Sequence, residues 1–233
     1  MCYNAAHNTN RGFQYAIAHA NTIEEKNEFE RKYLEWKKSN AVFAETYFTS
    51  AFSHDDFLVV YQEGGFTSVD QMQWGLIPRW CNNSEKSSVI QNQTINARSE
   101  TIFEKPAYRQ SALDRRCIIL MTGFFEFHHQ GRRKYPLFIQ QRKGEIMAVA
   151  GIWDEAEVDE KKIRSFSVVT VEANESMAKI HNNPKNPHRM PLILNPDQFR
   201  LWLTALEKDD VISKKMVSNL MQPYPSQDLS YST

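Results

Sequence analysis

Cys2 is the residue of this chain with the most direct chemistry of its own. Removal of Met1 would leave a free α-amine and a thiol on one cysteine, and an aminothiol of this kind captures aldehydes. The amine, with a reference pKa of about 8, is partly neutral near pH 7 and condenses to an imine. The thiol, with a reference pKa of about 8.5, then closes a five-membered thiazolidine ring. The competing interpretation is an idle cysteine, because any chain can begin Met-Cys.

Two segments contribute groups that exchange protons. Glu126 lies among apolar or small neighbours in Gly123–Phe127, and burial there would raise its carboxyl pKa towards the range of a general acid or base. An outward-facing surface glutamate fits the same segment. His181 ends a predicted helix, and histidine is the natural proton shuttle near neutral pH. Taken singly, a histidine in such a place is more simply a structural or solvated side chain.

Aromatic and basic residues suggest contacts with nucleic acid. Trp74–Trp80 places two tryptophans around a Gly/Pro turn beside an arginine, which suits either core packing or stacking on nucleobases, worth about 1–3 kcal/mol per base. Asn96 and Arg98 precede a predicted helix, where Arg98 would hold a phosphate bidentately or the segment would simply cap the helix. His128–Lys134 has the character of a charged hairpin tip, and no spacing in the sequence predicts a metal site or a bound cofactor.

The elements that would position these residues are short strands and a few helices. A capping box, Thr22 to Glu25, opens a predicted helix over 22–38. Helices are also predicted over 174–180 and from the N-cap Asn195, which a proline follows at N1. Apolar, β-rich runs bounded by turn residues predict strands at Phe57–Tyr61, Cys117–Met121, Tyr135–Gln140, Ile146–Ala150 and Phe166–Val171.

Together these elements predict a single α+β domain over residues 1–221, with a mostly antiparallel β-sheet or barrel-like core and flanking helices. The segment 222–233, with two prolines and several serines, is predicted to be a flexible tail. Lys+Arg 28 equals Asp+Glu 28, which removes the argument for a nucleic-acid partner from a basic excess and leaves only local patches. Three scattered cysteines without a CxxC pair indicate neither disulfides nor zinc. No apolar run approaches the roughly 20 residues of a membrane span, so a cytoplasmic protein is expected.

Seven separated blocks of the sequence occur in the order typical of one family. The sequence resembles the SOS-response-associated peptidase (SRAP) family from Cys2 to Leu194. A single block would be a weak match, whereas seven blocks in order are specific. The blocks are Cys2, Trp-Gly-Leu-Ile-Pro-x-Trp (74–80), Asn-Ala-Arg-Ser-Glu-Thr (96–101), Arg-Cys-Ile-Ile with Gly-Phe-Phe-Glu (116–126), Ala-Gly-Ile-Trp (150–153), Thr-Val-Glu-Ala-Asn-Glu (170–175) and Ile-His with Arg-Met-Pro-Leu-Ile-Leu (180–194).

The resemblance implies a suicide-type sensor of abasic sites that binds single-stranded DNA near duplex junctions and links covalently to the ring-opened sugar. Cys2 would supply the amine and thiol, inside a polar site formed by Asn96, Glu126 and His181. The C1′ aldehyde of the sugar accepts the amine, Glu126 or His181 delivers the proton to the departing oxygen, and Asn96 orients the aldehyde oxygen or the thiol. Slow thiol closure would leave a Schiff base that permits β-elimination, so a DNA lyase side activity is expected.

The same resemblance implies three DNA contacts. Nothing in the sequence indicates a coiled coil or a repeated interface, so a monomer is expected, associated with the nucleoid when it is bound to DNA. Trp74 matches a position near exposed bases, while Arg98 and Arg189 match positions on the phosphate backbone. Binding through a local patch would weaken steeply with salt. Tyr3 and Asn4 replace the Gly-Arg pair that is common in the family, which predicts a weaker affinity for DNA.

The spacing before Arg189 also departs from the family and leaves two histidines as rivals. His181 is favoured over His188, because the approach Ala-Asn-Glu-Ser-Met-Ala-Lys-Ile-His is intact. The insert Asn182–Pro187 would then bulge as a loop. Three functions compete: a covalent abasic-site sensor that removes only its own Met1, a cysteine peptidase acting on other proteins, and a non-catalytic reader of modified or single-stranded DNA.

Overall fold

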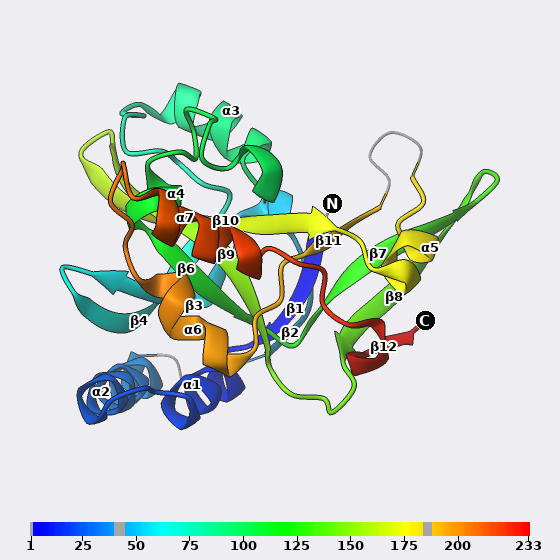
Figure 1. Ribbon diagram of the computed structural model, residues 1–233, viewed down its shortest axis with the longest axis horizontal. Coiled ribbons are helices and arrows are strands. Elements are labelled where there is room, and N and C mark those ends of the chain that lie inside the picture. The colour runs from blue at the N-terminus through cyan, green and yellow to red at the C-terminus, as the bar shows by residue number, and fades with distance from the viewer. Residues whose placement is uncertain (1, 40–44, 184–187) are drawn as a thin grey trace.

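The computed structural model describes residues 2–39, 45–183 and 188–233. Its centre is a closed five-stranded barrel in which β10 pairs with both β4 and β9, so that the sheet runs β10-β4-β3-β6-β9 and returns to β10 (Figure 1). Neighbouring strands are antiparallel except β4 and β10, which are parallel. The barrel strands are β3 (Asp56–Glu63), β4 (Phe66–Trp74), β6 (Arg116–Met121), β9 (Met147–Val158) and β10 (Lys161–Glu172).

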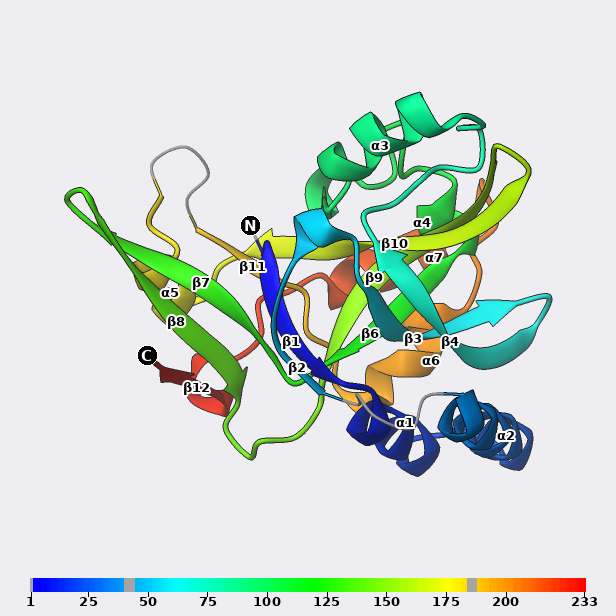
Figure 2. The ribbon, with the colours of Figure 1, turned by 180° about the vertical axis from the view of Figure 1, so that it is seen from behind.

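A second, fully antiparallel sheet has the order β12-β8-β7-β1-β2. It is joined to the barrel by Thr122, which alone separates β6 from β7 and donates its backbone N–H to the carbonyl of Ala6 at 2.9 Å. The β7–β8 hairpin extends away from the rest of the molecule (Figures 1 and 2). The strands of this sheet are β1 (Asn4–Asn8), β2 (Glu45–Ser50), β7 (Gly123–Gln130), β8 (Arg133–Gln141) and β12 (Leu229–Ser232).

Two short strands extend β10 beyond the barrel: β5 (Asn96–Arg98) pairs with it in parallel and β11 (Arg189–Pro191) in antiparallel. Helices cover the outside, with α1 and α2 side by side at one end and α3 at the other (Figure 2). The helices are α1 (Thr9–Ala18), α2 (Ile23–Ser39), α3 (Ser84–Gln93), α4 (Ser111–Asp114), α5 (Glu175–Ile180), α6 (Phe199–Leu203) and α7 (Val211–Leu220), with 3-10 turns at Ala51–Ser53, Ser99–Thr101, Pro196–Gln198 and Ser226–Asp228.

The sequence of β6 explains why the barrel forms the core. Every residue of β6 is buried, as expected for a continuous apolar strand covered on both faces. Opposite it, Gly151 of β9 allows the strands to pack closely: a Cβ at this position would lie 2.3 Å from Ile119 Cδ1 and 3.0 Å from the carbonyl of Ser167. A side chain at position 151 would therefore force the backbone of β9 or β10 to move.

The predicted α+β fold with a barrel-like core is confirmed, and the five predicted strands fall on β3, β6, β8, β9 and β10, with Ile146 alone lying one residue before its strand, β9. The capping residue Thr22 accepts the backbone N–H of Glu25 at 3.1 Å, as its sequence indicated. Asn174 likewise caps α5 by accepting from the backbone N–H of Met177 at 2.8 Å. The predicted helix at Asn195 begins as a 3-10 turn with a capping box before α6.

The expectation of a flexible tail over 222–233 is corrected. Residues Leu229–Ser232 form β12, which pairs with β8 from Leu229 opposite Gln141 to Ser232 opposite Phe138. The side chain of Leu229 is completely buried. The Pro and Ser content of the segment was misleading because its order comes from a strand partner far away in the sequence rather than from local propensity.

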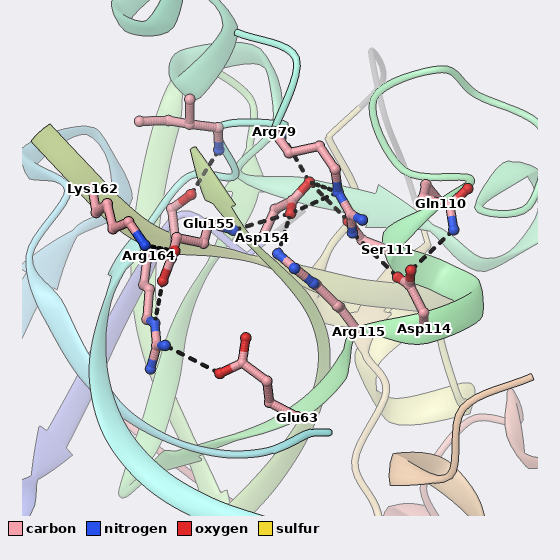
Figure 3. A network of polar contacts seen from close by, with 12 residues as sticks. Glu63, Arg79, Gln110, Ser111, Asp114, Arg115, Asp154, Glu155, Lys162 and Arg164 are labelled. Atoms are coloured by element: carbon pink, nitrogen blue, oxygen red, sulfur yellow. Dashed lines mark hydrogen bonds and ion pairs between the residues drawn. The ribbon is translucent and has the colours of Figure 1, made fainter. Parts of the chain in front are cut away.

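Arg79, in the turn that links β4 to α3, is held by a buried carboxylate at the end of the barrel (Figure 3). Asp154 accepts the backbone N–H of Arg79 at 2.9 Å and its Nε at 3.1 Å. It also accepts Arg115 Nη1 at 2.7 Å and the hydroxyl of Ser111 at 3.3 Å. Asp154 thus joins the turn that contains Arg79 to helix α4 and its C-cap, Arg115. The guanidinium of Arg79, next to Trp80, is therefore used in a structural ion pair.

We expect Asp154→Ala to lower the free energy of unfolding by about 2–3 kcal/mol, because two partly buried guanidinium groups lose their carboxylate. Asp154→Asn should cost less, since an amide oxygen still accepts the Arg79 N–H. Urea denaturation measures both changes, with Asp209→Ala at an exposed position as the control. A loss below about 0.5 kcal/mol for the alanine variant would show that the network adds nothing to stability.

Candidate functional site

Cys2 lies just before β1 and is held by Asn96, the first residue of β5. Asn96 Nδ2 donates to the carbonyl of Cys2 at 2.8 Å, and parallel pairing of Asn96 with Val168 of β10 fixes β5 in place. The Cys2 side chain is buried, with Sγ 3.8 Å from the carbonyl of Asn4. Among the described residues, the buried Oδ1 of Asn96 has no hydrogen-bond partner. An acceptor that is already desolvated is therefore available beside Cys2 for an incoming donor.

Glu126 brings a carboxyl group to the same place from β7. Its side chain is 7% exposed and accepts the backbone N–H of Phe127 at 3.1 Å. Burial raises the pKa of this carboxyl above its ordinary value. Burial, and to a lesser extent the nearby charge of Glu126, raise the pKa of the Cys2 thiol to about 12. The thiol is consequently protonated at neutral pH, and it needs a proton acceptor before it can attack.

His181 completes the polar group at the C-terminal end of α5, where its side chain is 3% exposed. Its Nδ1 lies 3.0 Å from both the backbone N and the carbonyl O of Arg189, so it accepts from one or donates to the other according to the tautomer. Burial lowers the pKa of His181 to about 4, so the ring is neutral at pH 7. His188, the rival candidate, is exposed and has its Nδ1 3.2 Å from the carbonyl of Ala178.

Glu126 and His181 line one cleft of about 290 Å³. Cys2 does not line the cleft, but the next two residues, Tyr3 and Asn4, do. A molecule in the cleft would therefore contact the residue adjacent to the cysteine. The other lining residues are Phe127, His129, Lys134 and Asn183. A larger groove, of about 760 Å³, lies between α2 and the β3–β4 hairpin and carries none of the predicted site residues.

The neutral His181 predicts a pH dependence of stability. Above pH 6.5 the imidazole is neutral in both the folded and the unfolded chain. As the pH falls from about 6.5 to about 4, the unfolded chain binds the proton first, so the free energy of unfolding falls by on the order of 2–3 kcal/mol. Urea titrations across this range should show a flatter dependence in His181→Asn than in the wild type. The exposed His188→Asn should keep the wild-type slope, and an unchanged slope in His181→Asn would contradict the buried neutral ring.

The expectation that Trp74 contacts exposed bases is corrected, because its ring is completely buried. Its Nε1 donates to the carbonyl of Ile95 at 3.1 Å, and Phe57 and Phe166 lie against it at centroid distances of 5.4 and 6.2 Å. The ring therefore presents no face for a base. Trp80, at the other end of the motif, is 57% exposed.

The expectation for Arg189 as a phosphate contact is corrected on similar grounds. Its guanidinium is buried and makes a two-pronged ion pair with Glu100, at 2.6 and 3.1 Å, and also donates to the carbonyl of Thr170 at 2.6 Å. The contribution of Arg189 to the site is its backbone, whose N–H and carbonyl lie within hydrogen-bond distance of His181 Nδ1. Arg98 differs, since it is exposed at the end of β5. Its charge acts on the phenol of Tyr3, whose pKa is raised by burial and by Glu126 and lowered by Arg98.

Two features of the site were not apparent in the sequence. Tyr3 stacks on Phe52 with ring centroids 5.5 Å apart and planes 21° from parallel, so an aromatic surface adjoins Cys2. Asn182, assigned above to an insert that bulges as a loop, uses its side-chain amide to bond both the backbone N–H and the carbonyl of His129, at 2.8 and 2.9 Å. Asn183 of that insert lines the cleft, and its residues 184–187 lie outside the described residues. Within residues 2–39, 45–183 and 188–233, no three His, Cys, Asp or Glu side chains come together as metal ligands, and no helix is both long and apolar enough to cross a membrane.

The sequence profile of the SOS response associated peptidase (SRAP) family matches residues 5–233, and the chain belongs to this family. One relative is the abasic site processing protein YoqW of Bacillus subtilis (strain 168), 30% identical over 176 residues, which span 75% of this chain and 72% of the relative. Another is the abasic site processing protein HMCES of Gallus gallus, 31% identical over 158 residues, which span 58% of this chain and 45% of that protein.

Solved structures share the fold over nearly the whole chain. A protein from Bacteroides thetaiotaomicron superposes with a TM-score of 0.80 at 27% identity, over 99% of this chain and 90% of the other. A protein from Bordetella bronchiseptica superposes with a TM-score of 0.72 at 18% identity, over 99% and 98% of the two chains, and supports the fold alone.

Proposed function

We propose that this protein processes abasic sites in single-stranded DNA by forming a covalent adduct between the ring-opened sugar and Cys2, after Met1 has been removed. The observation that carries the proposal is the arrangement of Cys2 with three polar residues. Asn96 is bonded to Cys2, and Glu126 and His181 line the cleft beside it. The names of the relatives, as abasic site processing proteins, support the same class of substrate.

The reaction begins with the amine of Cys2. The amine adds to the C1′ aldehyde and forms a carbinolamine, which loses water to become an imine when an acid protonates the departing hydroxyl. Glu126 suits this step, because burial raises the pKa of its carboxyl. The buried Oδ1 of Asn96, which has no hydrogen-bond partner among the described residues, is proposed to accept a hydrogen bond from the carbinolamine N–H.

The second step closes the ring. The Cys2 sulfur adds to the imine carbon, its thiol proton passes to a base, and the imine nitrogen takes up one proton, so that a thiazolidine forms with no further leaving group. Since the pKa of the thiol is about 12, this step depends on a neighbouring base, and neutral His181 or the carboxylate of Glu126 supplies one. The overall change is protein plus DNA minus one water. If closure is slow, the imine acidifies the C2′ proton and β-elimination of the 3′ phosphate follows, which is the proposed lyase activity.

The DNA strand is proposed to cross the cleft beside Tyr3, near a duplex junction. Exposed Arg98 supplies a phosphate contact next to the site, and the Tyr3–Phe52 pair supplies the aromatic surface that buried Trp74 does not. An abasic nucleotide has no base to extrude, so it enters such a cleft without an unstacking cost of its own.

A peptidase acting on other proteins is a weaker explanation of the site. The thiol of Cys2 is buried, its pKa is raised to about 12, and it does not line the cleft, whereas a peptidase cysteine needs a reactive thiolate facing its substrate. Removal of the chain's own Met1 is the one peptidase act included in the proposal.

Intact-mass spectrometry tests the proposal directly. Purified protein is incubated with a single-stranded oligonucleotide that carries one abasic site. We expect a protein mass without Met1 and a new species equal to protein plus oligonucleotide minus one water. The same oligonucleotide with an intact base is the control and should give no adduct. Absence of the adduct despite loss of Met1 would overturn the proposal.

A further inference from the structure

The β7–β8 hairpin forms a basic arm beside the cleft. We call residues 128–135 the arm: the last part of β7, the two-residue turn Gly131–Arg132 and the first part of β8 (Figure 1). Gly131 has φ of +62°, the left-handed conformation that glycine favours at the start of a two-residue hairpin turn. The chain thus reverses with the shortest common loop, which limits the conformational freedom of the tip.

The tip of the arm carries exposed positive charge on a chain of zero net charge. Arg132, Arg133 and Lys134 are all exposed, and none of the three makes an ion pair with the described residues. Lys134 also lines the cleft that contains Glu126 and His181. Positive charge is therefore present both at the cleft, on Lys134, and at the end of the arm, on Arg132 and Arg133.

The arm is braced where it leaves the sheet. β1 pairs with β7 only as far as Phe125, opposite Asn4, so the edge of β7 beyond this point has no strand partner there. The side-chain amide of Asn182 takes that place at His129, bonding both its N–H and its carbonyl. The ring of His128 adds a hydrogen bond from Nδ1 to the carbonyl of Lys179 in α5, at 2.9 Å. The residues on either side of His181, Lys179 in α5 and Asn182 after it, therefore hold the base of the arm beside the cleft.

We infer that the arm is a phosphate-binding surface for the DNA backbone on one side of the captured nucleotide. This inference rests on the proposed function for the identity of the strand in the cleft. Gln130 at the tip is four positions after Glu126, about 13 Å along the strand, which is far enough to reach phosphates beyond the captured nucleotide. Exposed cations that make no ion pair with the described residues suit a polyanion that leaves the cleft along the arm, and they contribute affinity without reading sequence.

The test is the salt dependence of non-covalent binding, measured by fluorescence anisotropy with an oligonucleotide that has no abasic site. The variant Arg132→Gln/Arg133→Gln removes two positive charges and leaves Lys134 in the cleft. Each lost phosphate contact should reduce the slope of log affinity against log salt by about 0.7 for single-stranded DNA. For the double variant we therefore expect the slope of log affinity against log salt to be smaller in magnitude by about 1.4. The ratio of wild-type to variant affinity should then fall about sevenfold between 50 and 200 mM salt.

The chain offers a matched control in its other long hairpin. Lys161→Gln/Lys162→Gln, at the tip of β9–β10, changes the net charge by the same amount at a tip remote from the cleft (Figure 2). Lys162 loses only an exposed ion pair with Glu155, so the fold should tolerate the change. The control should keep the wild-type slope. Equal losses in both variants would mean that only the overall charge matters and would overturn the inference.

Two shortened oligonucleotides locate the contact. One ends two nucleotides to the 5′ side of the abasic site and the other two nucleotides to the 3′ side. The wild type and the arm variant should bind one of these oligonucleotides with equal affinity, because that oligonucleotide no longer reaches the arm. The other oligonucleotide should still distinguish the two proteins. Adduct yield at low salt and saturating DNA should be unchanged in the arm variant. If the wild type makes no adduct but its salt slope still differs from that of the arm variant, the result would count against the proposed function and not against the arm.

Discussion

The variant Cys2→Ser is expected to form no stable adduct with an abasic-site oligonucleotide, while it binds the same DNA without the lesion as tightly as the wild type does. Serine keeps the α-amine, so an imine still forms. Its hydroxyl closes a five-membered ring that hydrolyses far more readily than a thiazolidine. The expected loss is therefore complete when adducts are scored by intact mass after heating.

Reduction separates the two halves of this chemistry. Borohydride converts an imine into a stable amine, so Cys2→Ser should yield a trapped adduct in its presence and none without it. The control is Cys81→Ser, which changes a second buried cysteine and leaves the terminus intact. Stable adduct from Cys2→Ser without reduction would show that the thiol takes no part. If borohydride traps no adduct with either Cys2→Ser or the wild type, the α-amine takes no part in the reaction either.

Glu126→Gln should slow adduct formation by about 10²–10⁴-fold, the usual contribution of a positioned general acid. The amide has the same shape and no titrating proton. Because the pKa of Glu126 is raised, the carboxyl keeps its proton to higher pH than an exposed glutamate does. The wild-type rate should accordingly fall as the pH rises through that pKa, and the variant should lack this limb. Single-turnover rates across pH 4–9 measure both effects.

A matched glutamate controls for loss of charge alone. Glu157→Gln changes an exposed carboxyl on β9 and should leave the rate and its pH profile unchanged. Glu126→Gln should also keep or slightly raise the free energy of unfolding, since a buried ionisable group becomes a neutral one. A rate loss accompanied by marked destabilisation would instead assign Glu126 to the fold.

The strands could be predicted from the sequence because their apolar runs carry local information. Cys117–Met121 is apolar throughout and lies in β6, which is buried from end to end. Closure of the barrel could not be predicted from the sequence. It depends on β10 pairing with both β4 and β9, and a local sequence pattern does not indicate which strand pairs with a strand far away in the chain. Helix α1 was missed for a related reason: its polar sequence and Gly12 are poor helix signals, and tertiary packing overrides them.

The sequence indicated which candidate residues lie near one another, but not how exposed each of them is. Cys2, Asn96, Glu126 and His181 do come together, as the resemblance implied. Trp74 and Arg189 illustrate the limit. Tryptophan and arginine are both residue types that bind DNA. However, the ring of Trp74 packs against Phe57 and Phe166. The guanidinium of Arg189 is bonded to Glu100 and Thr170. Whether an aromatic or a cation faces solvent is decided by neighbours that are remote in sequence.

The pairing of β1 with β7 has a consequence for the order of events during synthesis. Cys2 is made first, but Glu126 and His181 are added only after most of the chain has been translated. At about 5–20 residues per second, roughly ten to thirty-five seconds separate Cys2 from His181. Throughout this interval the amino terminus is outside its finished site and open to an aminopeptidase that acts on nascent chains. A self-processing route can begin only when the interval ends, so the timing of Met1 loss on stalled ribosomes distinguishes the two.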